Sequence, residues 1–313
     1  MQILFYSPDN KPEPWLAALA QALPEARVQV WQQGMTAADA LPADYIVAWQ
    51  PPAAMLAGQA NLKALFNLGA GVDAILQLGD ALPPQVSLVR LDDAGMAVQM
   101  AEYVSYAILR HFRRFDAFEQ QAQQQQWRCL KPNDKADFSV GILGLGVLGS
   151  RIAEAVQHFG FPLRGWSRSR KDLPGIQCFA GDAELDDFLR GTRILVCILP
   201  LTAETAQILS RSRLEMLPRG AYLINVARGA HLAESDLLAL IKSGHLTGAM
   251  LDVCRTEPLP PQHPFWQEPR ITLTPHIAAM TLREESVRQI AGKIRALERG
   301  EPIAGIVDRS KGY

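Results

Sequence analysis

The stretch FSVGILGLGVLGSRIA, from Phe138 to Ala153, decides the fold. Apolar residues typical of a strand come first, then glycines at 144, 146 and 149, then a segment of helical composition. A strand, tight turn and helix in this order direct the free N–H groups of the helix N-terminus at a phosphate, so the stretch predicts a dinucleotide-binding turn. Three glycines alone are a weak signal, and a plain glycine-rich turn is the alternative.

The residues after this turn continue an alternation of short apolar runs and helical segments. Candidate strands cover residues 138–143, 162–166, 193–198, 221–226, 247–252 and 271–274. Two mononucleotide-binding halves need six parallel strands, so the sequence predicts an α/β fold with a Rossmann doubly wound parallel sheet.

Nearly half of the chain precedes the glycine turn and forms a separate lobe in this interpretation. Apolar runs at 3–5, 28–30, 45–48 and 86–89 again alternate with helical segments, which favours a second parallel sheet. Long helices are predicted at 100–124 and 281–299, and the tail after Gly300 is too short to fold alone. We therefore predict one domain inserted into another: residues 1–103 with 282–313 form the substrate-binding domain, and residues 104–281 form the dinucleotide-binding domain.

Charge and composition exclude several classes of partner. A formal net charge of -1 over 313 residues provides no field that would attract nucleic acid or an anionic membrane, so a small molecule is the expected partner. No signal peptide or membrane-spanning run is evident. The cysteines match neither a metal spacing nor a disulfide framework, which favours reduced thiols in the cytoplasm and no metal site. They are Cys129, Cys178, Cys197 and Cys254.

The end of the second candidate strand indicates the type of dinucleotide. An NAD site carries an acid there for the ribose hydroxyls, but this chain has Ser167 followed by cations. Arg168, Arg170 and Lys171 stand where a 2′-phosphate would lie, and a guanidinium binds phosphate through two N–H groups. We expect NADP, with NAD at lower preference. For Arg170 and Lys171 the alternative is a solvated basic loop.

Three charged residues follow three later candidate strands. Arg228, Glu257 and His276 would converge at the carboxyl edge of the sheet if those strands are parallel. This set suits the reduction of a 2-oxo acid: His276 gives a proton to the carbonyl oxygen, Glu257 keeps the imidazole protonated, and Arg228 holds the substrate carboxylate. Each residue alone has an ordinary structural alternative, namely a surface arginine, a loop acid and a histidine after a strand.

Six motifs in this order resemble the D-isomer-specific 2-hydroxyacid dehydrogenases over nearly the whole chain, and most closely their glyoxylate/hydroxypyruvate reductase branch. The landmarks are NLGAGVD (67–73), GLGVLG (144–149), LPLTAET (199–205), INVARG (224–229), LDVCRTEP (251–258) and TPHIA (274–278). The resemblance implies a flavodoxin-like substrate domain and a homodimer.

The same resemblance assigns site residues. It implies that Arg228, Glu257 and His276 are catalytic and that Asp252 faces the nicotinamide carboxamide. It also implies that Pro200 and Thr202 line the cofactor cleft. The expected cofactor-binding residues are Gly144, Gly146, Val147, Leu148, Ser167, Arg168, Arg170, Pro200, Thr202, Val226, Ala227 and Asp252. His231 stands where many relatives have an acid and is expected to affect only packing.

Substrate binding is expected from two loops of the first domain, together with Arg228 and His276. Backbone N–H groups at Ala70 and Gly71 would bind the substrate carboxylate, and Trp49 would limit the substrate to a small side chain. A simple strand-to-helix turn and a buried packing tryptophan are the alternatives. The expected reaction is NADPH-dependent reduction of glyoxylate to glycolate and of hydroxypyruvate to D-glycerate. The alternatives are a dehydrogenase for another D-2-hydroxy acid and a non-catalytic dinucleotide-sensing interaction protein.

Overall fold

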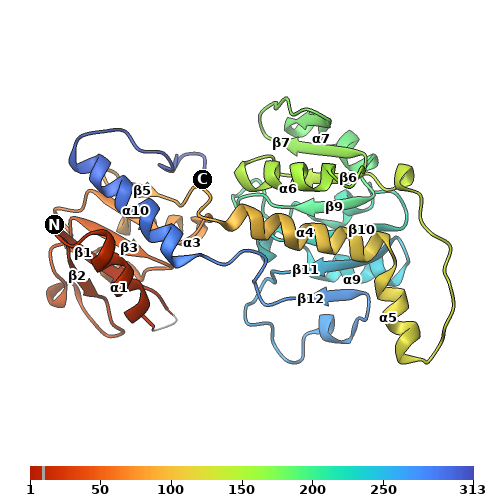
Figure 1. The fold of residues 1–313 in the computed structure, drawn as a ribbon, viewed down its shortest axis with the longest axis horizontal. Coiled ribbons are helices and arrows are strands. Elements are labelled where there is room, and N and C mark those ends of the chain that lie inside the picture. The colour runs from red at the N-terminus through yellow and green to blue at the C-terminus, as the bar shows by residue number, and fades with distance from the viewer. Residues whose placement is uncertain (9–10) are drawn as a thin grey trace. The chain divides into compact units, whose positions relative to one another are not determined.

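The protein forms two compact units in a computed structural model that describes residues 1–8 and 11–313. The first unit contains residues 1–95 and 281–313, and the second contains residues 96–280. Each unit has its own sheet (Figure 1). The predicted boundaries, at 103/104 and 281/282, lie further along the chain.

The first unit is built on a five-stranded sheet in which all strands are parallel. The strand order is β2-β1-β3-β4-β5, the flavodoxin-like order that the family resemblance implies. The strands are β1 (Gln2–Tyr6), β2 (Arg27–Val30), β3 (Tyr45–Ala48), β4 (Ala64–Asn67) and β5 (Ser87–Val89). The helices are α1 (Glu13–Ala22), α2 (Ala53–Leu56), α3 (Asp73–Leu76) and α10 (Arg283–Glu298), with short 3₁₀ turns at Ala37–Asp39 and Gly79–Ala81.

The chain returns to this sheet at its C-terminal end. Ile306 forms an antiparallel bridge with Val89 in β5, and the Val307 N–H donates to the Leu88 carbonyl at 2.9 Å. Val307 is buried among the apolar residues of the first unit. The last residues of the sequence therefore pack on its beginning.

The second unit is built on a seven-stranded parallel sheet, which confirms the predicted Rossmann class. Its order, β12-β11-β10-β9-β6-β7-β8, is that of two mononucleotide-binding halves with one strand added at an edge. The strands are β6 (Val140–Leu143), β7 (Leu163–Ser167), β8 (Ile176–Ala180), β9 (Ile194–Cys197), β10 (Ala221–Asn225), β11 (Leu246–Leu251) and β12 (Ile271–Leu273). The prediction of six strands was wrong because it missed β8, an edge strand in which only Phe179 is buried.

Helices cover both faces of this sheet. They are α4 (Met96–Phe112), α5 (Phe115–Gln123), α6 (Val147–Gln157), α7 (Gly181–Arg190), α8 (Arg211–Leu214) and α9 (Glu234–Lys242), with 3₁₀ turns at Lys135–Asp137, Gly229–His231 and Pro264–Gln267. Successive strand residues point to opposite faces. In β9, Ile194 and Val196 join the core under α4 and α6, whereas Leu195 and Cys197 join the core under α7 and α9. Figure 1 shows α4 and α6 together on one face.

The predicted single helix over residues 100–124 is two helices, so that prediction was wrong. The helix α4 begins at Met96 and ends at Phe112, and Arg114 adopts a left-handed conformation with φ of 59° before α5 begins. The apolar face of α4 packs on α6, while α5 buries only Gln121. Because α5 has almost no apolar face for that core, packing does not hold it in line with α4.

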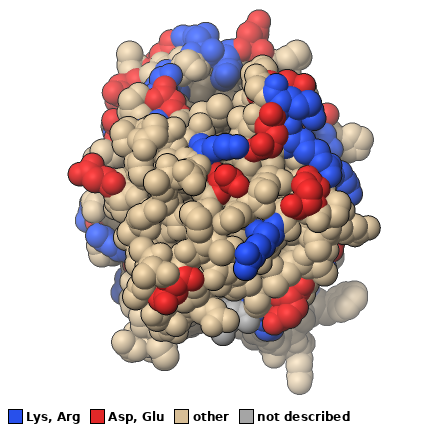
Figure 2. All heavy atoms as spheres, turned by 90° about the vertical axis from the view of Figure 1, so that its left-hand side faces the viewer, with Lys and Arg blue, Asp and Glu red and all other residues tan. Residues whose placement is uncertain are grey.

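The surface carries charges of both signs. Figure 2 shows basic and acidic side chains interspersed on one face, in keeping with the net charge of -1. In the described part of the chain, none of the helices combines the length and the apolar character needed to cross a membrane.

Candidate active site

The carboxyl edge of the second sheet brings together the residues that the sequence singled out in this unit. The strands β6, β7, β10, β11 and β12 all run parallel, so their carboxyl ends meet at one edge. The glycine turn follows β6, Ser167 ends β7, and Arg228, Glu257 and His276 follow β10, β11 and β12. A dinucleotide site in a doubly wound sheet lies at this edge.

The turn after β6 leaves the N-terminus of α6 open. Gly144 has φ of 119°, and a β-carbon on Gly149 would lie 1.8 Å from the Gly144 carbonyl oxygen, so only glycine permits this close approach. Gly146 caps α6 without a side-chain hydrogen bond, and Val147 is 55% exposed. The first N–H groups of the helix therefore face open space where a pyrophosphate fits.

The residues at the end of β7 and just after it differ in their hydrogen bonds and ion pairs. Ser167 is buried, and its hydroxyl donates to the Ser169 carbonyl at 2.7 Å. Arg170 forms an ion pair with Glu184 and donates to the Cys178 carbonyl at 3.0 Å, so this cation is held against β8 and α7. Arg168 is exposed.

The loop after β9 lies close to Arg168. A hydrogen bond from Thr202, reinforced by the charge of Arg168, lowers the pKa of Glu204. The Thr202 N–H donates to the Thr205 hydroxyl at 2.8 Å, and that hydroxyl donates to the Pro200 carbonyl at 2.7 Å. These bonds give the 200–205 loop a defined shape beside the predicted phosphate-binding cation.

Glu257 and His276 form a direct pair. Nδ1 of His276 lies 2.8 Å from Oε2 of Glu257, and both side chains are partly exposed. The second oxygen, Oε1, accepts from the Cys254 N–H at 2.9 Å. Burial alone would raise the pKa of Glu257, but the His276 and Cys254 hydrogen bonds and the charges of His276 and Arg228 together lower it. The carboxylate is thus kept ionised beside the imidazole.

Arg228 is held beside this pair by its neighbours. Its guanidinium donates to the Ala227 carbonyl at 2.7 Å, and Val226 and Ala227 are buried after β10. A β-carbon on Gly229 would lie 1.9 Å from the Cys254 carbonyl carbon, so glycine lets the chain after β10 press against the loop that leads to Glu257. This close approach brings Arg228 near the carboxylate.

His231 does more than fill space. It is fully buried, its Nδ1 accepts from the Arg228 N–H at 3.2 Å, and its Nε2 lies 3.3 Å from the Pro200 carbonyl oxygen. The ring therefore links the Arg228 backbone to the 200–205 loop. The sequence expectation of a packing residue missed these polar contacts.

Asp252 points into the protein. The residue is 2% exposed, and its carboxylate accepts hydrogen bonds from Thr274, Ile277 and Ala278 in the loop that carries His276. The contact of Asp252 with the nicotinamide carboxamide, which the resemblance implies, stays a prediction.

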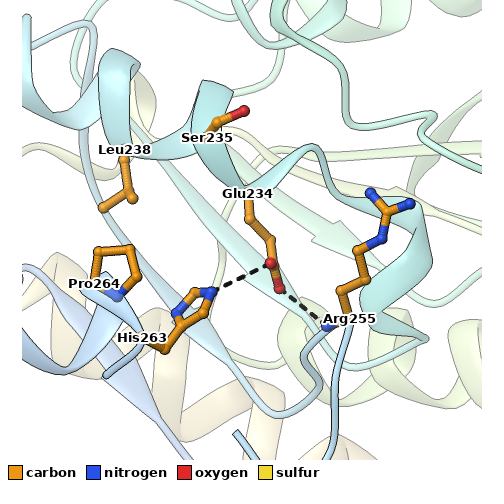
Figure 3. A pocket seen from close by; sticks show the side chains of 6 residues that line it. All are labelled: Glu234, Ser235, Leu238, Arg255, His263 and Pro264. Atoms are coloured by element: carbon orange, nitrogen blue, oxygen red, sulfur yellow. Dashed lines mark hydrogen bonds and ion pairs between the residues drawn. The ribbon is translucent and has the colours of Figure 1, made fainter. Parts of the chain in front are cut away.

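A cavity of about 340 Å³ is lined by Glu234, Ser235, Leu238, Arg255, His263 and Pro264 (Figure 3). Glu234, at the start of α9, accepts from the Arg255 N–H at 2.9 Å and lies 3.4 Å from Nε2 of His263 (Figure 3). Glu234 therefore braces two points of the loop on either side of Glu257. Sequence reasoning missed Glu234, because no local pattern marks a contact between a helix start and a distant loop.

The first unit shapes the predicted substrate loop by its own contacts. The Asn67 side-chain amide donates to the carbonyls of Gly69 and Gly71 at 2.9 and 2.8 Å. A β-carbon on Gly69 would lie 2.6 Å from the Trp49 ring, so that ring packs on the loop. Ala70 and Gly71 stay partly exposed.

The fold and site geometry of the second unit agree with a match to a known protein family. Residues 105–278 match the family described as D-isomer specific 2-hydroxyacid dehydrogenase, NAD binding domain. The chain belongs to this family. It is therefore an oxidoreductase, as the motifs predicted.

Comparison with full-length relatives shows which members of the family this dehydrogenase is similar to. It is 51% identical to glyoxylate/hydroxypyruvate reductase A of Serratia proteamaculans, with all of both chains covered. A solved D-isomer specific 2-hydroxyacid dehydrogenase of Xanthobacter autotrophicus Py2, in complex with NADPH and MES, is 40% identical with a TM-score of 0.94. An NADPH-dependent glyoxylate/hydroxypyruvate reductase of Sinorhizobium meliloti, in complex with NADP and sulfate, is 34% identical with a TM-score of 0.91. Both structural matches cover 100% of this chain and 99% of the other.

Proposed function

We propose that this dehydrogenase uses NADPH to reduce glyoxylate to glycolate and hydroxypyruvate to D-glycerate. The observation that carries the proposal is the Glu257–His276 pair, with 2.8 Å between Oε2 and Nδ1, at the strand edge that holds the glycine turn. The full-length likeness to reductases of these two acids supports the choice of substrates.

His276 acts as the acid in this proposal. When bound, NADPH supplies a hydride to the carbonyl carbon of the 2-oxo acid. Negative charge then builds on the carbonyl oxygen, and His276 neutralises it by giving up a proton through Nε2 while Nδ1 stays on Glu257. The carboxylate stabilises the protonated ring before the transfer, and Arg228 holds the substrate carboxylate and polarises the carbonyl.

We assign substrate contacts on the first unit to Trp49, Ala70 and Gly71. The two carbonyls that accept from Asn67 fix the loop, and the partly exposed residues 70 and 71 offer backbone N–H groups to a carboxylate. The Trp49 ring on Gly69 favours a substrate with a small side chain.

We assign the phosphates of the cofactor to two places. Gly144, Gly146, Val147 and Leu148 bind the pyrophosphate through backbone N–H groups, and Arg168 with Ser167 binds the 2′-phosphate. Arg170 contributes less because Glu184 already pairs with it. Pro200, Thr202, Val226 and Ala227 line the remainder, and Asp252 faces the nicotinamide carboxamide. NAD binds more weakly because β7 ends in Ser167 and not in a carboxylate.

We also infer a homodimer in the cytoplasm. Trp127 is 101% exposed and lines one cavity with Phe118, and Phe115, on the same helix as Phe118, is 45% exposed. Apolar side chains gathered in this way are typical of a protein interface, and a second copy of the chain is the proposed occupant. The four cysteines are all free thiols, which suits a reducing compartment.

A comparison of kcat/KM over short 2-oxo acids, with NADPH and with NADH, tests the proposed function. We expect glyoxylate and hydroxypyruvate to be the best substrates, longer 2-oxo acids to be poorer, and NADPH to be preferred. A His276→Ala variant should bind NADPH normally but lose about 10²–10⁴-fold in kcat. No turnover with any short 2-oxo acid, or full activity of that variant, contradicts the proposal.

A further inference from the structure

The loop after β12 holds His276 in an uncommon backbone conformation. Its φ is 57°, in the left-handed region that residues with a β-carbon rarely adopt. Such a conformation persists where the surrounding structure imposes it. The His276 N–H donates to the backbone carbonyls of Asp252 at 2.8 Å and Thr274 at 3.1 Å, so two neighbouring residues define it.

The Asp252 side chain accepts hydrogen bonds from this loop on both sides of His276. Before it in sequence, the Thr274 hydroxyl donates to Oδ1 at 2.7 Å. After it, the N–H groups of Ile277 and Ala278 donate to Oδ1 and Oδ2, each at 2.8 Å. The carboxylate is buried, and hydrogen bonds to an ionised acceptor are shorter and stronger than neutral ones. One side chain thus holds three residues of the loop in position.

Thr274 extends this network to α4. The phenol oxygen of Tyr103 lies 2.5 Å from the Thr274 hydroxyl oxygen. A threonine hydroxyl has one hydrogen, and the Asp252 carboxylate is an acceptor only, so Tyr103 must be the donor to Thr274. Burial raises the pKa of Tyr103, so its phenol stays protonated in the neutral range. The helix that carries Tyr103 packs on α6 and provides a rigid anchor.

We propose that Tyr103, Thr274 and Asp252 form a clamp that presents His276 to Glu257. This inference rests on the proposed function, in which His276 is the acid. Within the clamp all three act as positioning residues, through contacts to the loop and to one another. The clamp sets how often the imidazole stands in the geometry that delivers a proton, so it acts on kcat and not on substrate binding.

Replacing Thr274 tests the clamp. Thr274→Val removes the hydroxyl and keeps the shape, while Thr274→Ser keeps the hydroxyl and serves as the matched control. We expect the valine variant to lose about tenfold in kcat, with the KM of the 2-oxo acid and the Kd of NADPH within about twofold of the parent. The serine variant should recover most of the lost activity. A serine variant as slow as the valine variant, or a valine variant with parental kcat, overturns the proposal.

A double-mutant cycle tests whether the clamp acts through His276. In the His276→Ala background, Thr274→Val should change kcat by less than about twofold, because the group that it positions is already gone. The same loss in both backgrounds would show that Thr274 acts by another route. A loss of NADPH binding that matches the loss in kcat would place the effect at the cofactor and also contradict the clamp.

Amide hydrogen exchange separates failure of the clamp from failure of the proposed function. The peptide that contains Ile277 and Ala278 should exchange faster in Thr274→Val than in the parent or in Thr274→Ser, whatever the substrate. Tyr103→Phe, which removes the donor at the far end of the network, should move exchange and kcat in the same direction by a smaller factor. If His276→Ala keeps full activity, the proposed function fails, while unchanged exchange in both clamp variants refutes the clamp itself.

Discussion

At the scale of single residues, Glu257 accepts hydrogen bonds from two sides. One oxygen accepts from the Cys254 backbone, and the other faces Nδ1 of His276. The first bond orients the carboxylate, so the second can hold the imidazole ring in place. Glu257 therefore positions the acid, and its removal should lower the rate.

Glu257→Gln should lower kcat by about 10- to 100-fold at neutral pH. The glutamine keeps the shape and a hydrogen-bond acceptor but lacks the negative charge that faces Nδ1 of His276, so the proton donor is held less well as the charge on the substrate oxygen develops. Initial rates with glyoxylate and NADPH measure the loss, and a variant with parental kcat contradicts the assigned role.

Arg168→Ala should weaken the use of NADPH and leave NADH almost unchanged. A lost contact to the 2′-phosphate removes a charge-assisted hydrogen bond, which corresponds to about a tenfold or larger rise in the KM for NADPH. Arg170→Ala is the matched control, and a smaller effect is expected because Glu184 already pairs with that cation. Equal effects of the two substitutions, measured with both cofactors, would refute the larger role assigned to Arg168 in binding the 2′-phosphate.

At the scale of elements, α4 contributes both core packing and a half-buried titratable ring. His111 stacks on Tyr222 of β10 with ring centroids 4.1 Å apart, and burial is the main cause that lowers the pKa of His111 to about 4. The folded state therefore holds a neutral imidazole that the unfolded chain would protonate at higher pH. Stability is unaffected above the ordinary histidine pKa and falls as the pH drops from about 6.5 to about 4.

His111→Phe should flatten this acid dependence. The phenyl ring preserves the stack on Tyr222 but takes up no proton, so the slope of unfolding free energy against pH should decrease by up to about 1.4 kcal/mol per pH unit. Urea unfolding of both proteins across that range, followed by circular dichroism, measures the slope. Parallel curves for the two proteins would show that another group governs acid unfolding.

At the scale of the whole molecule, the exposed apolar side chains around α5 indicate a surface that binds another protein chain. Phe118 and Trp127 line a cavity with residues 121–122 and 125–129, and this surface belongs to the second unit alone. A surface of this kind is typical of an interface, and we propose a second copy of the chain there.

Trp127→Asp should shift the protein from dimer to monomer. A buried unpaired charge at an interface destabilises association, so the apparent dimer Kd should rise by at least about a hundredfold. Sedimentation equilibrium measures this rise, and Ile306→Asp, at an exposed apolar position of the first unit, is the control that should not dissociate the dimer. A parental protein that is monomeric at all concentrations contradicts the homodimer.

Much of the fold could be predicted because it depends on local patterns. The alternation of apolar runs and helical segments predicted parallel sheets, and the glycine turn placed the first strand of the Rossmann half. The edge strand β8 and the break at Arg114 could not be predicted in this way. An edge strand buries little, and a helix ends where its apolar face has nothing to pack against.

The sequence by itself determined the family, the fold class and which charged residues follow which strands, because spacing along the chain and the parallel direction of strands dictate these. Only the tertiary structure decided which partners those side chains contact. Arg170 forms an ion pair with Glu184, and the Asp252 carboxylate accepts hydrogen bonds from the loop that carries His276. Such pairings join elements that are far apart in the chain. They depend on distances across the folded core, which no periodicity along the sequence contains.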